Sequence, residues 1–189
     1  MTLPPPLSEE TRHDLLALAR GSLEAAFRGE PPPRLGSDRS EAFGQPRALF
    51  VTLKKDGALR GCIGTLSPDG DLALMVPVFA RKAAFEDPRF PPLSGDELPR
   101  CVIEISALTA PQPVEGPEEI VVGRDGLILE CRGHRGLLLP QVATEWGFDR
   151  TAFLDAVAQK AGLPPVAWRD PASRLWVFQA EVFGESAAQ

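Results

Sequence analysis

The stretch Leu59-Arg60-Gly61-Cys62-Ile63-Gly64-Thr65 decides the fold. It follows an apolar run over residues 48–53 and the polar segment Lys54-Lys55-Asp56-Gly57. Two β-prone runs separated by a polar turn that ends in glycine predict a hairpin. Alternation along the second strand puts Arg60 and Cys62 on one face with Gly64, and residues 59, 61, 63 and 65 on the other. The guanidinium and the thiol would then lie roughly 6–7 Å apart along the strand.

The two glycines admit two interpretations, because glycine weakens a strand and usually marks a bulge, a bend or a close approach of another group. In a binding site, Gly61, Gly64 and Thr65 would line the floor, Arg60 would hold an anion and Cys62 would react. In a purely structural hairpin, Cys62 would be buried and inert, as most free cysteines are, and Arg60 would lie on the surface. The segment alone slightly favours the structural interpretation.

Composition limits the classes of function. The chain has 189 residues, of which 43% are hydrophobic and 24% charged, which is typical of one globular domain. A net charge of -6 and a pI near 5.0 argue against a general nucleic-acid binder. The three cysteines form no C-x-x-C pair and there are only two histidines, so the sequence predicts no metal site and no cofactor.

The location of the protein is also constrained by sequence. The N-terminus has neither a basic segment nor a long apolar one, so we expect no secretory signal. No run of about 18 apolar residues is present, so we expect no membrane span. Free thiols suit a reducing compartment, and the sequence therefore predicts a cytoplasmic protein.

Periodicity predicts helices and strands in mixed order. Helices are expected after Ser8 and over residues 71–86, 140–146 and 149–161, and strands over residues 100–109, 119–122, 127–131, 135–139 and 174–183. Because strands and helices do not alternate regularly, this order predicts an α+β fold, with a mainly antiparallel sheet and flanking helices.

Three charged residues outside the hairpin are further candidates. Arg89 is fixed between prolines in Asp87-Pro88-Arg89-Phe90-Pro91-Pro92, and would bind an anion or form a structural salt bridge, with the two readings about even. Glu104 lies in an apolar strand, where it would face water or pair with a cation such as Arg60. Glu104 or Glu181 would serve Cys62 as a catalytic base only if the fold brought them near.

The chain resembles a known family over nearly its whole length. The resemblance is carried by residues 59–65, by Ala83-Ala84-Phe85 with Asp87-Pro88-Arg89-Phe90-Pro91-Pro92-Leu93, by residues 136–143 and by the closing strand at residues 178–183. These motifs resemble the AMMECR-one domain family, also called protein A of the AmmeMemoRadiSam system. The resemblance implies a single domain over residues 1–189, with its core at about 8–183. It also implies a larger and a smaller lobe around a cleft lined by residues 59–65.

The resemblance implies partners but assigns no reaction. The family name implies association with a Memo-type protein and a radical SAM protein; this chain lacks the three-cysteine motif of an iron–sulfur cluster. One hypothesis is an enzyme or enzyme subunit that acts at Cys62 on an unknown small molecule or peptide, with Arg60 activating the thiol. The alternative is a non-catalytic adaptor module that uses Arg60 to hold an anionic group.

Overall fold

A computed structural model describes residues 5–36, 41–45, 47–67 and 70–186. The chain divides into two units, one formed by residues 1–109 with 181–189 and the other by residues 110–180. Both combine helices with antiparallel strands, so the fold is α+β, as the order of elements predicts. The last strand, β7 (Arg174–Gly184), contributes residues to both units.

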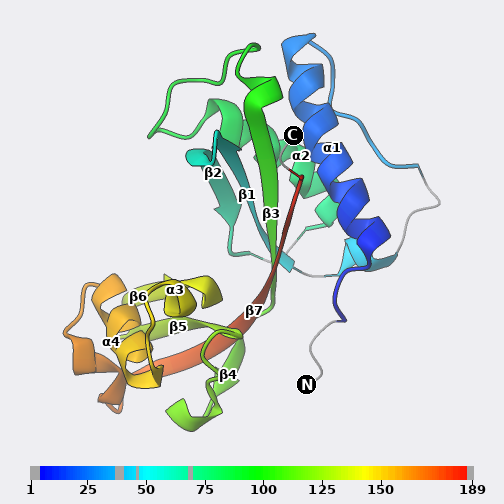
Figure 1. The fold of residues 1–189 in the computed structure, drawn as a ribbon. Helices are drawn as coiled ribbons and strands as arrows, with labels where there is room; N and C mark the ends of the chain where they lie inside the picture. Colours follow the sequence, from blue (N-terminus) through cyan, green and yellow to red (C-terminus); the bar gives the residue numbers. More distant parts are fainter. Residues whose placement is uncertain (1–4, 37–40, 46, 68–69, 187–189) are drawn as a thin grey trace. The chain divides into compact units, whose positions relative to one another are not determined.

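The first unit is an antiparallel sheet covered on one face by two helices. Its elements are α1 (Glu9–Phe27), β1 (Arg47–Lys55), β2 (Ala58–Thr65), α2 (Leu72–Phe85) and β3 (Cys101–Thr109). The strands lie in the order β2-β1-β3, and α1 and α2 pack together against them (Figure 1). Leucines, valines, isoleucines and alanines from both helices and all three strands form the core.

Capping residues set the helix boundaries in this unit. The side chain of Ser8 accepts a hydrogen bond from the backbone N–H of Thr11, which satisfies a free donor at the start of α1. Asp71 does the same for Ala73 at the start of α2. Pro77 lies inside α2 and remains buried there. Both helices occur where the sequence predicts them.

A β-bulge in the β1–β2 hairpin interrupts the simple alternation of side chains along β2. Lys54 pairs with Leu59 but Leu53 pairs with Gly61, so Arg60 is the extra residue. The guanidinium of Arg60 and the ammonium group of Lys55 both bind the carboxylate of Glu97. Lys55 lies two residues after Leu53 on β1, so it is on the same side of the strand as this core residue. Cys62, by contrast, pairs with Thr52 on the opposite face of the strand. The predicted placement of Arg60 and Cys62 on one face is therefore wrong.

The second unit packs helices on a separate group of strands. Its elements are β4 (Gln112–Val114), β5 (Asp125–Cys131), β6 (His134–Leu138), α3 (Pro140–Glu145), α4 (Arg150–Lys160) and the first part of β7. Strands β4 and β5 pair with the same residues of β7, so they flank it, and β6 pairs with β5. Its core is formed mainly by α4 residues such as Phe153 and by Leu127 and Leu129 of β5.

One predicted strand is wrong. Residues 119–122 form the end of a short 3-10 turn and a loop, and β4 lies within residues 111–118, which the sequence predicts as loop. The physical cause is Asp125, whose buried carboxylate accepts a hydrogen bond from the backbone N–H of Val121 and holds the segment in a turn. Ile120 is fully buried in the core of the second unit, which accounts for the apolar character of the segment.

Candidate functional site

Cys62 is the most accessible of the three cysteines. It is half-buried, whereas Cys101 and Cys131 are buried, and all three are free thiols. The hydroxyl of Thr52, the cross-strand partner of Cys62 on β1, donates a hydrogen bond to the Cys62 sulfur over 3.2 Å. Burial raises the pKa of the Cys101 thiol. Among the three cysteines, only Cys62 therefore has a sulfur that is accessible and accepts a hydrogen bond from a hydroxyl group.

The loop after α2 is fastened to the backbone of Cys62. The Cys62 N–H donates to Oδ2 of Asp87 over 2.8 Å, and Nη2 of Arg89 donates to the Cys62 carbonyl over 3.2 Å. Arg89 also binds both carboxylate oxygens of Asp87, at 2.9 and 2.8 Å. These three residues therefore form a closed set of hydrogen bonds, with both polar backbone groups of Cys62 satisfied.

Charge is distributed unevenly within this set. The carboxyl of Asp87 is 5% exposed, and its hydrogen bonds, first from the Arg89 side chain, hold its pKa well below the ordinary value despite burial. The Arg89 side chain is 55% exposed. Its pKa is raised first by the hydrogen bond to Asp87 and in smaller part by the Cys62 thiol. Arg89 therefore forms a salt bridge, one of the two alternatives left open by the sequence, and its guanidinium also binds the backbone carbonyl of Cys62.

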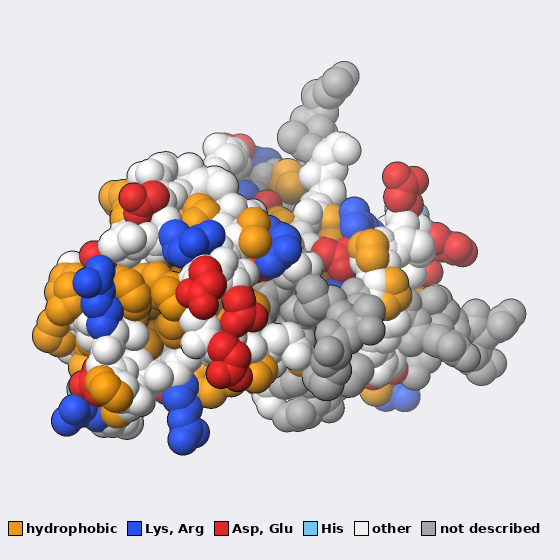
Figure 2. All heavy atoms as spheres, turned by 90° about the horizontal axis from the view of Figure 1, so that it is seen from below, with side chains coloured by type: hydrophobic (Ala, Val, Ile, Leu, Met, Phe, Trp, Pro, Cys, Tyr) orange, Lys and Arg blue, Asp and Glu red, His pale blue; other side chains and the backbone are white. Residues whose placement is uncertain are grey.

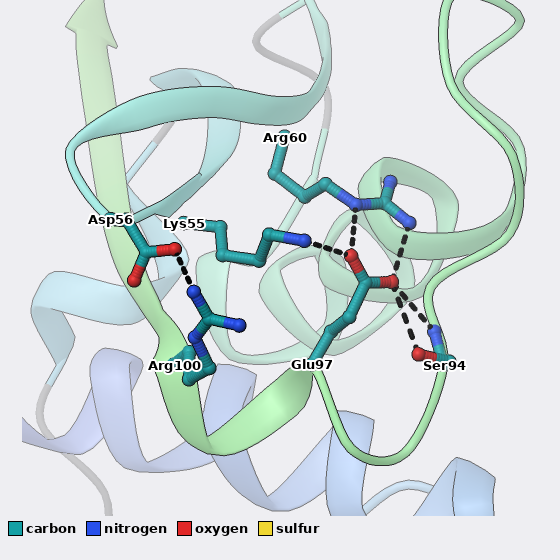
Figure 3. Close-up of polar contacts among 6 residues, drawn as sticks. All are labelled: Lys55, Asp56, Arg60, Ser94, Glu97 and Arg100. Carbon is teal, nitrogen blue, oxygen red and sulfur yellow. Dashed lines mark hydrogen bonds and ion pairs between the residues drawn. The ribbon is translucent and has the colours of Figure 1, made fainter.

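Arg60 is itself buried and belongs to a separate, partly exposed cluster, drawn in Figure 3. Its Nε and Nη2 donate to the two oxygens of Glu97 at 3.1 and 2.9 Å. Lys55 and both the backbone N–H and the hydroxyl of Ser94 donate to the same carboxylate. The hydrogen bond to Arg60 is the main reason that the pKa of Glu97 is lowered. Arg60 is thus neutralised, and only its Nη1 is buried without a hydrogen-bond partner among the described residues.

Phe90 lies between the two arginines of the site. The guanidinium carbon of Arg60 is 5.9 Å from the centre of the Phe90 ring, and that of Arg89 is 5.7 Å from it. Both distances fall within the range of cation–π attraction. The ring therefore separates the Glu97 cluster from the more exposed Arg89 and Cys62.

The glycines of the signature stretch are required by packing. A Cβ added at Gly61 would lie 2.1 Å from the backbone oxygen of Ala83, so α2 approaches the strand at this position. A Cβ at Gly64 would lie 2.2 Å from the backbone oxygen of Leu49 and 2.4 Å from the Phe50 ring. The expected close approach is confirmed at both glycines, and the approaching groups belong to the protein. The Thr65 hydroxyl accepts a hydrogen bond from the Ser67 N–H and closes a turn after β2.

The two candidate carboxylates are each paired with other cations. Glu104 binds Lys54 at 2.8 Å, and its cross-strand partner on β1 is Thr52. Glu181 accepts hydrogen bonds from Arg12 and from the fully buried Arg47, at 2.9 and 2.7 Å. Neither carboxylate is hydrogen-bonded to the Cys62 sulfur in the part of the chain that the structure describes. Glu104 does share a cross-strand neighbour with Cys62, through Thr52.

Sequence reasoning did not identify three residues of the site, which are Thr52, Asp87 and Glu97. Asp87 binds the backbone N–H groups of Arg89 and Cys62. Thr52 and Glu97 carry no distinguishing pattern, because one is an ordinary strand threonine and the other an ordinary loop glutamate. Only the three-dimensional arrangement brings them to Cys62 and Arg60.

The described residues contain neither a candidate metal site nor a helix suited to cross a membrane. No group of three or more histidine, cysteine, aspartate or glutamate side chains there is arranged to hold a metal ion. No helix in the same ranges is long and apolar enough to cross a membrane. On the face drawn in Figure 2, basic and acidic side chains are interspersed, without a continuous basic area.

Comparisons with known proteins give one consistent result. The family model AMMECR1 matches residues 16–183. A protein of Methanothermobacter thermautotrophicus is 46% identical, covering 95% of this chain and 97% of its own, and one of Thermococcus gammatolerans is 43% identical, covering 95% and 92%. The crystal structure of the uncharacterized protein PH0010 from Pyrococcus horikoshii is similar, with a TM-score of 0.78 and 40% identity over 92% of this chain and 90% of that one.

Proposed function

The chain belongs to the AMMECR1 family, and from that premise we propose that it is a cytoplasmic enzyme or enzyme subunit whose chemistry is centred on the Cys62 thiol. The observation that carries the proposal is the environment of the sulfur. It is the most accessible thiol in the chain, it accepts a hydrogen bond from Thr52, and the exposed Arg89 donates a hydrogen bond to the backbone carbonyl of the same residue. A nearby cation favours the thiolate, which is the nucleophilic form.

The roles proposed for the two arginines differ from the sequence-based hypothesis. Arg89 takes the role of the cation beside Cys62, because its side chain is half-exposed and contacts the Cys62 carbonyl. Arg60 supports the site from the buried side, because its charge is satisfied by Glu97. A substrate anion would therefore meet Arg89 rather than Arg60.

The partners in this proposal are a Memo-type protein and a radical SAM protein of the AmmeMemoRadiSam system. A division of labour with partners suits a thiol that has a hydroxyl donor and a cation but no base hydrogen-bonded to it among the described residues. The missing proton acceptor would then come from the substrate or from a partner.

A second candidate function is an adaptor that binds an anionic group without chemistry. The observation that favours it is the closed set of hydrogen bonds around Asp87 and Arg89, which holds a cation at a fixed place on the surface. In this alternative, Cys62 only packs beside the bound group.

Co-expression with the two proposed partners distinguishes the candidates. The chain and its Cys62→Ala and Arg89→Ala variants would each be purified with a Memo-type and a radical SAM protein, and small-molecule turnover by the mixture followed by mass spectrometry. An enzyme subunit predicts that the wild type and both variants retain the partners and that turnover requires Cys62. Unchanged turnover with Cys62→Ala would reject the thiol-centred reaction, and loss of partners only with Arg89→Ala would favour the adaptor.

A further inference from the structure

The second unit contains a hollow that the Cys62 site does not use. It lies at the end of the β5–β6 hairpin, where Arg132 and Gly133 form a turn with positive φ angles of 50° and 85°. The hollow has a volume of about 470 Å³. Ligand sites in proteins commonly have volumes of ~300–1,000 Å³, so the hollow is large enough for a small molecule.

The charged side chains that line the hollow are mostly arginines. Arg132, Arg135 and Arg174 come from the turn, β6 and β7, and Glu130 of β5 is the one acidic residue in the lining. His134 also lines it, with its Nδ1 3.3 Å from the carbonyl of Ala161. The lining therefore carries more positive than negative charge, in a chain whose net charge is -6.

The positive charges are incompletely neutralised. Arg174 has no ion pair and no side-chain hydrogen bond within the ranges that the structure describes, although its strand pairs with that of Glu130. Glu130 instead forms an ion pair with Arg135 at 3.5 Å, a distance too long for an ordinary hydrogen bond. Arg132 binds Asp170, which lies outside the lining. At least one guanidinium, that of Arg174, is thus available to a ligand.

We propose that this hollow binds a small anion that carries a phosphate or diphosphate group. Guanidinium groups bind phosphate through paired, charge-assisted hydrogen bonds. A phosphate presents three acceptor oxygens and up to two negative charges, which suits arginines that approach from three different elements better than a planar carboxylate does. A long polyanion is disfavoured, because the net charge of the chain is negative and the basic side chains gather in one small hollow.

Calorimetric titration of the full chain with pyrophosphate tests this proposal. We expect saturable binding at one site, and Arg174→Ala should weaken it roughly tenfold or more, since hydrogen bonds to charged groups contribute about 1.5–3 kcal/mol. Glu130→Gln should strengthen binding several-fold by removing the lining carboxylate, and a gain of affinity cannot result from misfolding. The matched control is Arg169→Ala, which removes a nearby arginine that stacks on Trp168 and does not line the hollow.

Each of the following outcomes would overturn the proposal. The first is the absence of saturable heat when pyrophosphate is added to the wild-type chain. The second is equal weakening of binding by Arg169→Ala and Arg174→Ala, which would indicate a general charge effect. The third is binding of citrate as tight as that of pyrophosphate, which would indicate a carboxylate site. The fourth is an unchanged affinity in Glu130→Gln, which would place the anion elsewhere.

Discussion

The two faces of β2 differ in how they treat their charged and reactive groups. On the helix-covered face, Arg60 is 8% exposed and its charge is matched by Glu97, which also binds Lys55. On the other face, Cys62 is half-buried and lies beside Arg89, whose side chain is half-exposed. Residues two apart in the sequence thus have different environments: Arg60 holds the loop and the strand together through Glu97, whereas Cys62 keeps an accessible thiol.

The largest effect should come from filling the contact between β2 and α2. Gly61→Ala places a Cβ against the Ala83 carbonyl, and backbone groups yield less than side chains do. Overpacking of this kind typically costs 1–3 kcal/mol, and we expect a loss near the upper end, about 3 kcal/mol. Urea denaturation measures it. Gly44→Ala is the control, because a Cβ there meets open space; equal stability of the two variants would contradict the close approach.

A smaller effect is expected from breaking the Arg60–Glu97 cluster. Arg60→Met removes the main partner of Glu97 but leaves Lys55 in place, so we expect a loss of stability smaller than that of Gly61→Ala but larger than that of an exposed ion pair. Arg100→Met is the matched control, because Arg100 forms an exposed pair with Asp56 in Figure 3 and should contribute less than ~1 kcal/mol. Similar losses in thermal or urea unfolding would mean that the Arg60 cluster is not special.

The Asp87 carboxylate, which binds the backbone of Cys62, should make the stability of the protein depend on pH in the acid range. Its pKa is lower in the folded than in the unfolded chain, so it stabilises the fold at pH values above about 4, its ordinary pKa, and this contribution decreases as the pH falls below that value. Asp87→Asn should therefore destabilise the protein most at neutral pH, with the difference from wild type narrowing in acid. Urea midpoints from pH 7 to pH 3 measure it. Asp56→Asn is the exposed control; a constant difference for Asp87→Asn would refute the linkage.

Much of the fold follows from local sequence signals, whereas the site depends on one bulge. Helix caps such as Ser8 and Asp71 and the Asp56-Gly57 turn are local features, so they were predictable. A regular two-residue hairpin would place Cys62 opposite Val51, but the bulge at Arg60 moves its partner to Thr52. Gly61 indicates a bulge, a bend or a close approach without distinguishing among them, and thus the separation of Arg60 from Cys62 could not be read from alternation.

The partners on each face come from distant segments, which is a second limit on prediction. Glu97 reaches Arg60 across 37 positions, and Asp87 reaches Cys62 across 25. The rigid Asp87–Pro92 segment was recognisable as a turn, and the salt bridge of Arg89 was one of two open alternatives. The sequence does not show that the loop carrying Arg89 binds to β2, because this contact depends on the packing of α2 against β2.

The rate at which iodoacetamide alkylates Cys62 tests the central claim most directly. Mass spectrometry would follow the Cys62 peptide in the wild type and in the Arg89→Ala and Arg60→Met variants, with the buried Cys101 as an internal reference. If Arg89 is the cation that acts on the thiol, Arg89→Ala should slow the reaction several-fold, while Arg60→Met leaves the rate unchanged. A slower reaction with Arg60→Met and an unchanged one with Arg89→Ala would contradict the account.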